Sequence, residues 1–139
     1  MKRIFLDANI LLDVALRRMP FAVDSSRIFS LEKNYLKFTS SLNISNVYFL
    51  IRKDYDKYVA RTNIGIIIQH CQMLDVNSMM IKNAHVNLFE RFNDFEDAVQ
   101  HYCAVAHSMD VIVTRNGKDF RNAEIPVYSP KDFIKAFGE

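Results

Sequence analysis

The feature that most constrains the fold of this chain is a short apolar run at residues 3–6, which ends abruptly at Asp7. The apolar spacing of a helix follows at once, beginning at Ile10 and Leu11, so we read a buried strand that turns directly into a helix. Asn9 is placed to cap that helix. In an open α/β sheet, ligands bind beyond the carboxyl ends of the strands, where this pattern places Asp7. Taken alone, Asp7 is equally well explained as a helix cap.

The rest of the chain alternates strand-like and helix-like segments. Further strands are expected at residues 35–39, 73–76, 111–114 and 125–128, the last at a sheet edge because it contains a proline. Helical spacing covers residues 21–31, 42–52, the segment up to Cys71, 78–109 with a break at 93–94, and the C-terminal segment opened by Ser129 and Pro130. Parallel neighbours need crossover connections. The pattern therefore predicts one α/β domain over residues 1–139, with a parallel five-stranded sheet and helices on both faces.

Composition limits the classes of protein to which this chain can belong. A chain of 139 residues with 50% hydrophobic content can bury a substantial core, and its net charge of +2 is too small to indicate a nucleic-acid-binding protein by bulk charge. The sequence shows neither a signal peptide nor an apolar run long enough to span a membrane, so we expect a cytoplasmic protein. Its two cysteines, Cys71 and Cys103, lie on the apolar sides of helical patterns and are expected to be buried and reduced.

Polar side chains gather at matching positions of this alternation. They are Asp7 after the first strand, Asp94, Glu96 and Asp97 at the start of a long helix, and Asn116 and Asp119 after the fourth strand. Converging carboxylates raise one another's pKa unless a cation compensates, and oxygen ligands favour Mg²⁺ or Mn²⁺. Such a site suits phosphodiester hydrolysis. Singly, however, acids at a helix start are explained by the helix dipole, and the apolar face of the helix at 95–106 leaves Asp97 on its opposite side.

Three segments in this order, at residues 5–13, 94–100 and 113–120, resemble the PIN-domain family, and especially the VapC-like toxins. The resemblance spans nearly the whole chain. It implies a three-layer α/β/α fold and a metal-dependent ribonuclease. It also implies a homodimer and, as a partner, a cognate antitoxin protein.

Carried over by position, the resemblance assigns the site residues. Asp7, Asp97 and Asp119 are the expected catalytic carboxylates. The expected ligands of Mg²⁺ or Mn²⁺ are Asp7, Glu96, Asp97, Asn116 and Asp119. Asn9 and Thr114 are expected to support them, with Thr114 lining the site.

The chain departs from the family pattern in one position. The family usually carries a glutamate early in the helix after the second strand, and this chain has Asn46 there, with no carboxylate between Glu32 and Asp54. Asparagine still offers a neutral carbonyl oxygen but lowers the charge that holds a cation. Glu96 is the candidate to compensate. We therefore expect metal binding to be weaker than in relatives.

Two basic residues next to the last motif, Arg115 and Lys118, are expected to bind the phosphates of RNA. Asp13 is expected to be a solvated helix residue with a supporting role at most. We also expect self-association through helices of the first half, which carry large apolar side chains such as Met19, Phe21, Tyr55 and Tyr58 near their ends.

Two other functions compete with the nuclease. The segment at residues 7–9 is similar to the nucleophile motif of haloacid-dehalogenase-type phosphatases, but those need a second aspartate where Asn9 stands. The other alternative, motivated by Asn46, is a catalytically weakened PIN fold that binds RNA or protein. Cleavage of RNA with and without metal separates these classes.

Overall fold

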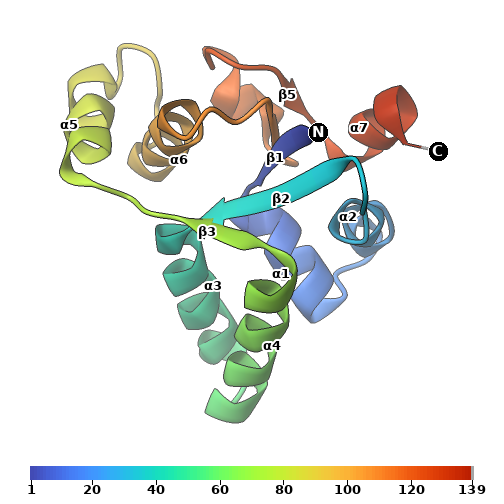
Figure 1. Cartoon of the computed structure of the whole chain (residues 1–139). Coiled ribbons are helices and arrows are strands. Elements are labelled where there is room, and N and C mark those ends of the chain that lie inside the picture. Colours follow the sequence, from blue (N-terminus) through green and yellow to red (C-terminus); the bar gives the residue numbers. More distant parts are fainter. Residues whose placement is uncertain (139) are drawn as a thin grey trace.

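The computed structural model describes residues 1–138 and contains a five-stranded, all-parallel sheet in the order β3-β2-β1-β4-β5 (Figure 1). The strands are β1 (Lys2–Leu6), β2 (Tyr35–Ser40), β3 (Gln72–Leu74), β4 (Val111–Val113) and β5 (Val127–Tyr128). The α-helices are α1 (Ala8–Leu16), α2 (Phe21–Phe29), α3 (Ser41–Asp54), α4 (Lys57–His70), α5 (Ser78–Asn87), α6 (Phe95–Ala106) and α7 (Pro130–Phe137), and a 3₁₀ turn, η1, spans Gly117–Phe120.

The central strand β1 is buried on both faces, and its side chains alternate between two cores. Ile4 and Leu6 pack with residues of α1, α2, α3, α4 and α7, whereas Phe5 packs with residues of α5 and α6. Ile112 in β4 points to the same side as Phe5. A parallel strand covered by helices on both faces is the reason for the continuous apolar runs in the sequence. The expected fold class is therefore confirmed.

The strand order creates a crevice beside β1. The chain runs outward from β1 to β2 and β3, then returns to place β4 on the other side of β1, where Leu6 is in register with Val113. This reversal is the topological switch point at which α/β sheets bind ligands. The backbone N–H of Asp7 donates to the carbonyl of Val113 across a distance of 3.1 Å. The residues that follow β1 and β4 therefore meet at the crevice.

Side-chain caps fix the start of most helices. The oxygen atoms that accept a backbone N–H there belong to Asp7 for α1, Ser40 for α3, Asp56 for α4, Asn77 for α5, Asp94 for α6 and Ser129 for α7. Such caps satisfy N–H groups that have no partner inside the helix. The expected opening of α7 by Ser129 as cap and Pro130 in its first turn is confirmed.

Several boundaries differ from the sequence expectation, among them that of the last strand, which covers Val127–Tyr128 rather than residues 125–128. The third strand covers Gln72–Leu74 rather than residues 73–76, and the break in the long helical segment is wider than residues 93–94. The chain leaves the helix at Leu88 and forms a bridge to Phe92, whose ring is buried in the α6 core. Burial of Phe92 fixes a loop that helical periodicity alone does not reveal.

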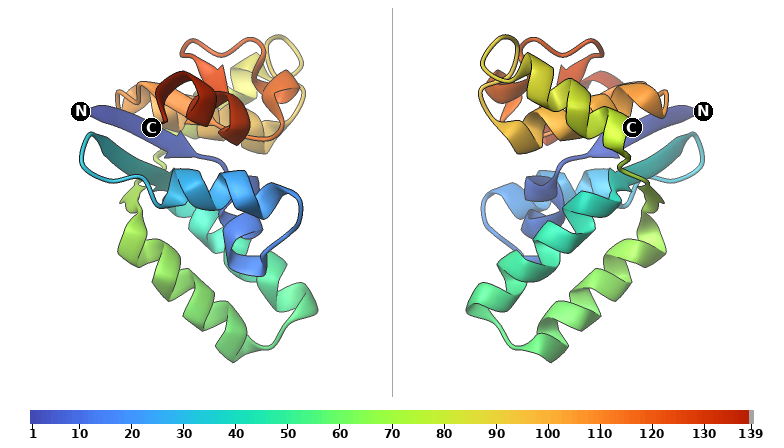
Figure 2. Two further views of the ribbon diagram at one scale, coloured as in Figure 1. Left: turned by 90° about the vertical axis from the view of Figure 1, so that its right-hand side faces the viewer. Right: turned by 90° about the vertical axis from the view of Figure 1, so that its left-hand side faces the viewer.

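The antiparallel pair α3 and α4 projects from the body of the molecule, as both views of Figure 2 show. Aromatic side chains near its far end are exposed, among them Tyr55 and Tyr58. No helix within residues 1–138 is long and apolar enough to cross a membrane. Cys71 and Cys103 are buried and free, as expected.

Candidate active site

Asp7 occupies the junction of β1 and α1 and is only 6% exposed. Its Oδ1 accepts the N–H of Ala8 at 2.8 Å, so Asp7 is itself the cap of α1. The expectation that Asn9 caps the helix is wrong, because the helix starts at Ala8, directly after the strand. Burial raises the pKa of Asp7, and the nearby carboxylates of Glu96 and Asp119 raise it further, against hydrogen bonds that lower it. Capping of α1 uses only the Oδ1 atom of Asp7.

The other oxygen of Asp7 is held by residues of α1 and of the segment after β4. The hydroxyl of Thr114 donates to Oδ2 at 2.8 Å, and Nδ2 of Asn9 lies 3.4 Å from the same atom. Asn9 also donates to Thr114 and accepts the N–H of Arg115. The neutral side chain of Asn9 thus links Asp7, Thr114 and Arg115. It does not supply the second carboxylate that a haloacid-dehalogenase-type phosphatase needs at this position.

Asp97 lies in the first turn of α6, whose cap, Asp94, accepts the N–H of Asp97 at 3.0 Å. Its carboxyl group is partly buried, and this burial, with repulsion from Asp7, Asp94, Asp119 and Glu96 in that order, raises its pKa to about 7. Asp97 is therefore close to Asp7 although the helix wheel places it away from the apolar face. The first turn of α6 lies at the crevice. Asp97 is near Asp7 because it belongs to this turn, although it is not on the apolar face of the helix.

Glu96 and Asn46 meet across the crevice. Nδ2 of Asn46 in α3 donates to Oε1 of Glu96 in α6. Asn46 thus reaches the carboxylate cluster from the position where the PIN pattern has its glutamate. The pair brings a carboxylate into this region from α6 rather than from α3, and Glu96 raises the pKa values of both Asp7 and Asp97.

Two expected residues follow β4 on the opposite side of the crevice. Asp119 lies in η1, is exposed, and raises the pKa values of Asp7 and Asp97. Asn116 is exposed and contributes its backbone, with its N–H donating to the hydroxyl of Thr114 at 3.1 Å. The structure thus brings Asp7, Glu96, Asp97 and Asp119 into one electrostatic group.

The donor chemistry of this group fits a hard cation. Carboxylates that repel one another lose that repulsion when Mg²⁺ or Mn²⁺ binds between them. Among residues 1–138, no three His, Cys, Asp or Glu side chains form a group that could hold a metal ion. Mg²⁺, however, commonly retains several waters and binds through one or two carboxylates. Asp7 and Asp97 are the residues that would hold it.

A buried polar layer that the sequence reading did not identify lies beneath the site. Thr39 donates to the carbonyl of Leu6 at 2.9 Å, and the side chain of Asn43 donates to Thr39 at 3.1 Å. Ser40 in turn donates to Oε1 of Gln100 in α6 at 2.6 Å. These bonds tie β2, α3 and α6 to the end of β1. The small polar residues at the end of the second strand were the only signal for this layer.

Asp13 differs most from the sequence expectation. It is fully buried rather than solvated, and its carboxylate binds both Arg18 and Arg115. Arg115, expected to bind RNA, directs its guanidinium at Asp13 and lies over the ring of Phe21. Lys118 is exposed in η1 and remains the better candidate for a phosphate contact.

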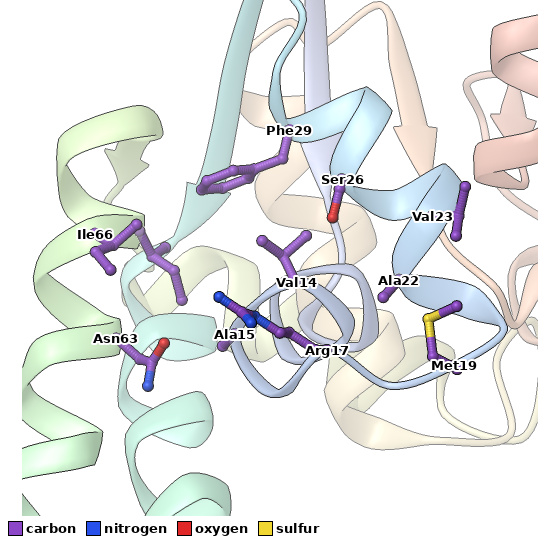
Figure 3. A pocket seen from close by; sticks show the side chains of 11 residues that line it. Val14, Ala15, Arg17, Met19, Ala22, Val23, Ser26, Phe29, Asn63 and Ile66 are labelled. Atoms are coloured by element: carbon purple, nitrogen blue, oxygen red, sulfur yellow. The ribbon is translucent and has the colours of Figure 1, made fainter.

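A separate apolar groove of about 540 Å³ lies between α2 and α4 over α1 (Figure 3). Its lining is Val14, Ala15, Arg17, Met19, Ala22, Val23, Ser26, Phe29, Asn63, Ile66 and Ile67. Figure 3 shows Arg17 extending from the end of α1 toward α4. Met19, Val23 and Ile66 are exposed apolar side chains in this groove.

Comparison with known structures finds the same fold in bacterial toxin proteins. The chain superposes on a chain of DNA-bound VapBC from Salmonella typhimurium with a TM-score of 0.73 and 15% identity, covering 94% of this chain and 99% of that chain. VapBC-1 of nontypeable Haemophilus influenzae gives 0.72 and 15%, covering 93% and 98%. VapC20 of Mycobacterium tuberculosis, described as a sarcin–ricin-loop-cleaving toxin, gives 0.66 and 14%, covering 78% and 86%.

Comparison with curated protein sequences finds no significant match. A family model described as PIN domain, in contrast, matches residues 3–118, which include Asp7, Glu96 and Asp97 and end one residue before Asp119. The match covers most of the chain and agrees with the strand order and the crevice described above. The chain therefore belongs to the PIN-domain family.

Proposed function

We propose that this protein is a Mg²⁺- or Mn²⁺-dependent endoribonuclease and the toxin of a toxin–antitoxin pair. The proposal rests on the carboxylates beside the switch point of the sheet: Thr114 holds Asp7 there at 2.8 Å, and Glu96 and Asp119 raise the pKa values of both Asp7 and Asp97. The toxins among the similar structures support it, and one of them is described as cleaving the sarcin–ricin loop, an RNA.

The chain's own residues can each be given a task in phosphodiester hydrolysis. Thr114 and Asn9 fix Oδ2 of Asp7, so that carboxylate needs little reorganisation when a cation and RNA bind. Asp97 and Asp7 would hold the cation, which offsets the repulsion that helps to raise the pKa of Asp97 to about 7 in the metal-free protein. Lys118, which is exposed in η1, is the residue we assign to contact with a phosphate of the RNA. A bound Mg²⁺ or Mn²⁺ would supply positive charge that stabilises the phosphoryl oxygens.

Metal-dependent cleavage is the direct test. We expect the purified protein to cleave single-stranded RNA in the presence of Mg²⁺ or Mn²⁺ and to lose this activity in excess chelator, because the carboxylates need a cation to offset their repulsion. Gel analysis of a labelled RNA measures it. Full cleavage in excess chelator would contradict the metal dependence, and RNA binding without any cleavage would support the weakened PIN fold instead.

An antitoxin partner is proposed from the comparisons, because several similar structures are toxin–antitoxin complexes. A cytoplasmic location also remains a proposal, consistent with two buried cysteines that form no disulfide.

Self-association through the first half of the chain is expected as well. Met19 and Tyr58 are each 67% exposed, and Phe21 and Tyr55 are exposed too, which is unfavourable for large apolar side chains on a monomer. Light scattering at high micromolar concentration should give twice the monomer mass, and Met19→Asp should shift the mass toward that of the monomer. A monomeric mass for the unmodified protein would contradict the homodimer.

A further inference from the structure

The fully buried carboxylate of Asp13 joins three parts of the protein. It accepts Nε of Arg115 at 2.6 Å and Nη2 of the same residue at 3.1 Å, which is a two-point contact. Arg18 donates from its Nε at 3.1 Å, and Ser25 in α2 donates its hydroxyl at 3.1 Å. A buried charge needs partners of this kind, and losing one of them is costly. Asp13 thus connects α1 and α2 to the segment after β4.

Arg115 directly follows Thr114, the residue whose hydroxyl holds Asp7. Its side chain is anchored to Asp13, and its guanidinium lies 3.8 Å from the centre of the Phe21 ring. Its backbone N–H donates to Oδ1 of Asn9 at 3.3 Å. Both the side chain and the main chain of Arg115 are therefore attached to α1 or α2. Two of the three guanidinium nitrogens of Arg115 are thus bonded to Asp13.

The hydrogen bonds continue from Arg115 into the site. Asn9, which receives the N–H of Arg115, donates its amide to Asp7 and to Thr114, and Thr114 also accepts the N–H of Asn116. Residues 114–116 therefore form a short segment that is hydrogen-bonded to Asp7 and Asn9 and, through the side chain of Arg115, to Asp13. If the attachment to Asp13 is removed, Thr114 keeps its bonds to Asp7 and Tyr128, but the backbone N–H groups of residues 115 and 116 are held by neutral hydrogen bonds alone.

We propose that Asp13 and Arg115 act as a positioning pair for the active site. The pair holds residues 114–116 against α1, so that the hydroxyl of Thr114 keeps its contact with Asp7. It does not touch RNA. This inference rests on the proposed nuclease function, since it concerns the site of that reaction, but the order of the segment can be measured without any activity.

Amide hydrogen exchange measured by NMR tests the pair directly. Arg115→Lys keeps the charge but loses the two-point contact, and Arg115→Gln removes the charge; both leave Asp13 bound to Arg18 and Ser25, so the fold should survive. We expect the amides of residues 115 and 116 to exchange about 10-fold faster or more in both variants, as expected for local opening. The amide of Ile112, bonded to Pro126 in the sheet, should be unchanged. Arg121→Ala, an exposed arginine after η1, is the matched control and should leave all three amides unchanged.

Kinetics distinguish positioning from RNA binding. We expect kcat to fall by about 10-fold or more in Arg115→Gln, with partial recovery in Arg115→Lys and little change in KM, because small displacements of reacting groups slow the chemical step. Lys118→Ala should instead raise KM. Unchanged exchange at residues 115 and 116 would overturn the positioning pair, and so would a rise in KM alone for Arg115→Gln. If the unmodified protein cleaves no RNA, the proposed function fails, but the exchange measurement still decides the role of Arg115.

Discussion

Replacing Asp97 with asparagine should abolish RNA cleavage and, at the same time, stabilise the metal-free protein. The carboxyl group of Asp97 is partly buried and faces Asp7, Asp94, Asp119 and Glu96, which together raise its pKa from 3.8 to about 7. Asparagine has nearly the same shape but carries no charge. We expect cleavage to fall at least about 100-fold, more than is typical for residues that only orient a metal ligand. The same loss is expected for Asp7→Asn.

The effect on stability has a defined pH window. Because the folded-state pKa of Asp97 lies above its usual value of 3.8, the folded protein binds more protons than the unfolded chain between about pH 4 and 7. Stability of the unmodified metal-free protein should therefore fall as the pH rises through this window, and the loss should be complete above it. Asp97→Asn should melt higher at about pH 8 and show a smaller loss, with little difference at about pH 4.

Thermal unfolding in chelator across this pH range measures the effect. Asp54→Asn, which removes an exposed carboxylate at the end of α3, is the matched control and should behave like the unmodified protein. Identical pH profiles for Asp97→Asn and the unmodified protein would show that Asp97 does not experience the proposed repulsion. Added Mn²⁺ should stabilise the unmodified protein more than Asp97→Asn, because only the former keeps both carboxylates.

Asn46→Glu should lower the melting temperature of the metal-free protein and enlarge the shift that Mn²⁺ produces. Asn46 donates its amide to Glu96, so a glutamate there exchanges a favourable hydrogen bond for carboxylate repulsion. With Mn²⁺ bound, the new carboxylate becomes an additional ligand, and binding to the folded state recovers the lost stability by mass action. The metal-induced rise should therefore exceed that of the unmodified protein.

Ser45→Glu provides a closely matched control for this experiment. Ser45 is the preceding residue of α3 and is exposed, so its replacement makes the same change in net charge at nearly the same distance from the helix start. Its metal-induced shift should equal that of the unmodified protein. Equal shifts for Asn46→Glu and Ser45→Glu would contradict the placement of Asn46 beside the metal-binding carboxylates.

The sequence predicted the fold because the central strands β1 and β4 are buried apolar runs and most of the helices between the strands have side-chain caps. Asp7 could be selected for a local reason, since it ends an apolar strand and begins a helix. Asp97 was harder, because helical periodicity reports which face is apolar but not where the first turn points. Its place became apparent only from the position of α6 relative to β1.

Asp13 and Arg115 show why other parts of the site could not be predicted. They lie 102 residues apart, and nothing near either one indicates an ion pair with the other. An acid beside Leu12 in a helix is usually solvated, and an arginine beside a nuclease site usually suggests phosphate binding. The two expectations failed together because each residue is the other's partner. Only the register of β4 against β1 brings them into contact.

The place of β1 in the middle of the sheet determines when the carboxylate group can assemble during synthesis. The neighbours of β1 are β2, which follows it early, and β4, which emerges from the ribosome only after residue 113 has been added. Until then Asp7 lacks Thr114, Asp119 and the segment that Arg115 anchors. Long-range pairing of this kind is also slow to form. A nascent chain that ends before β4 therefore lacks the assembled carboxylate group.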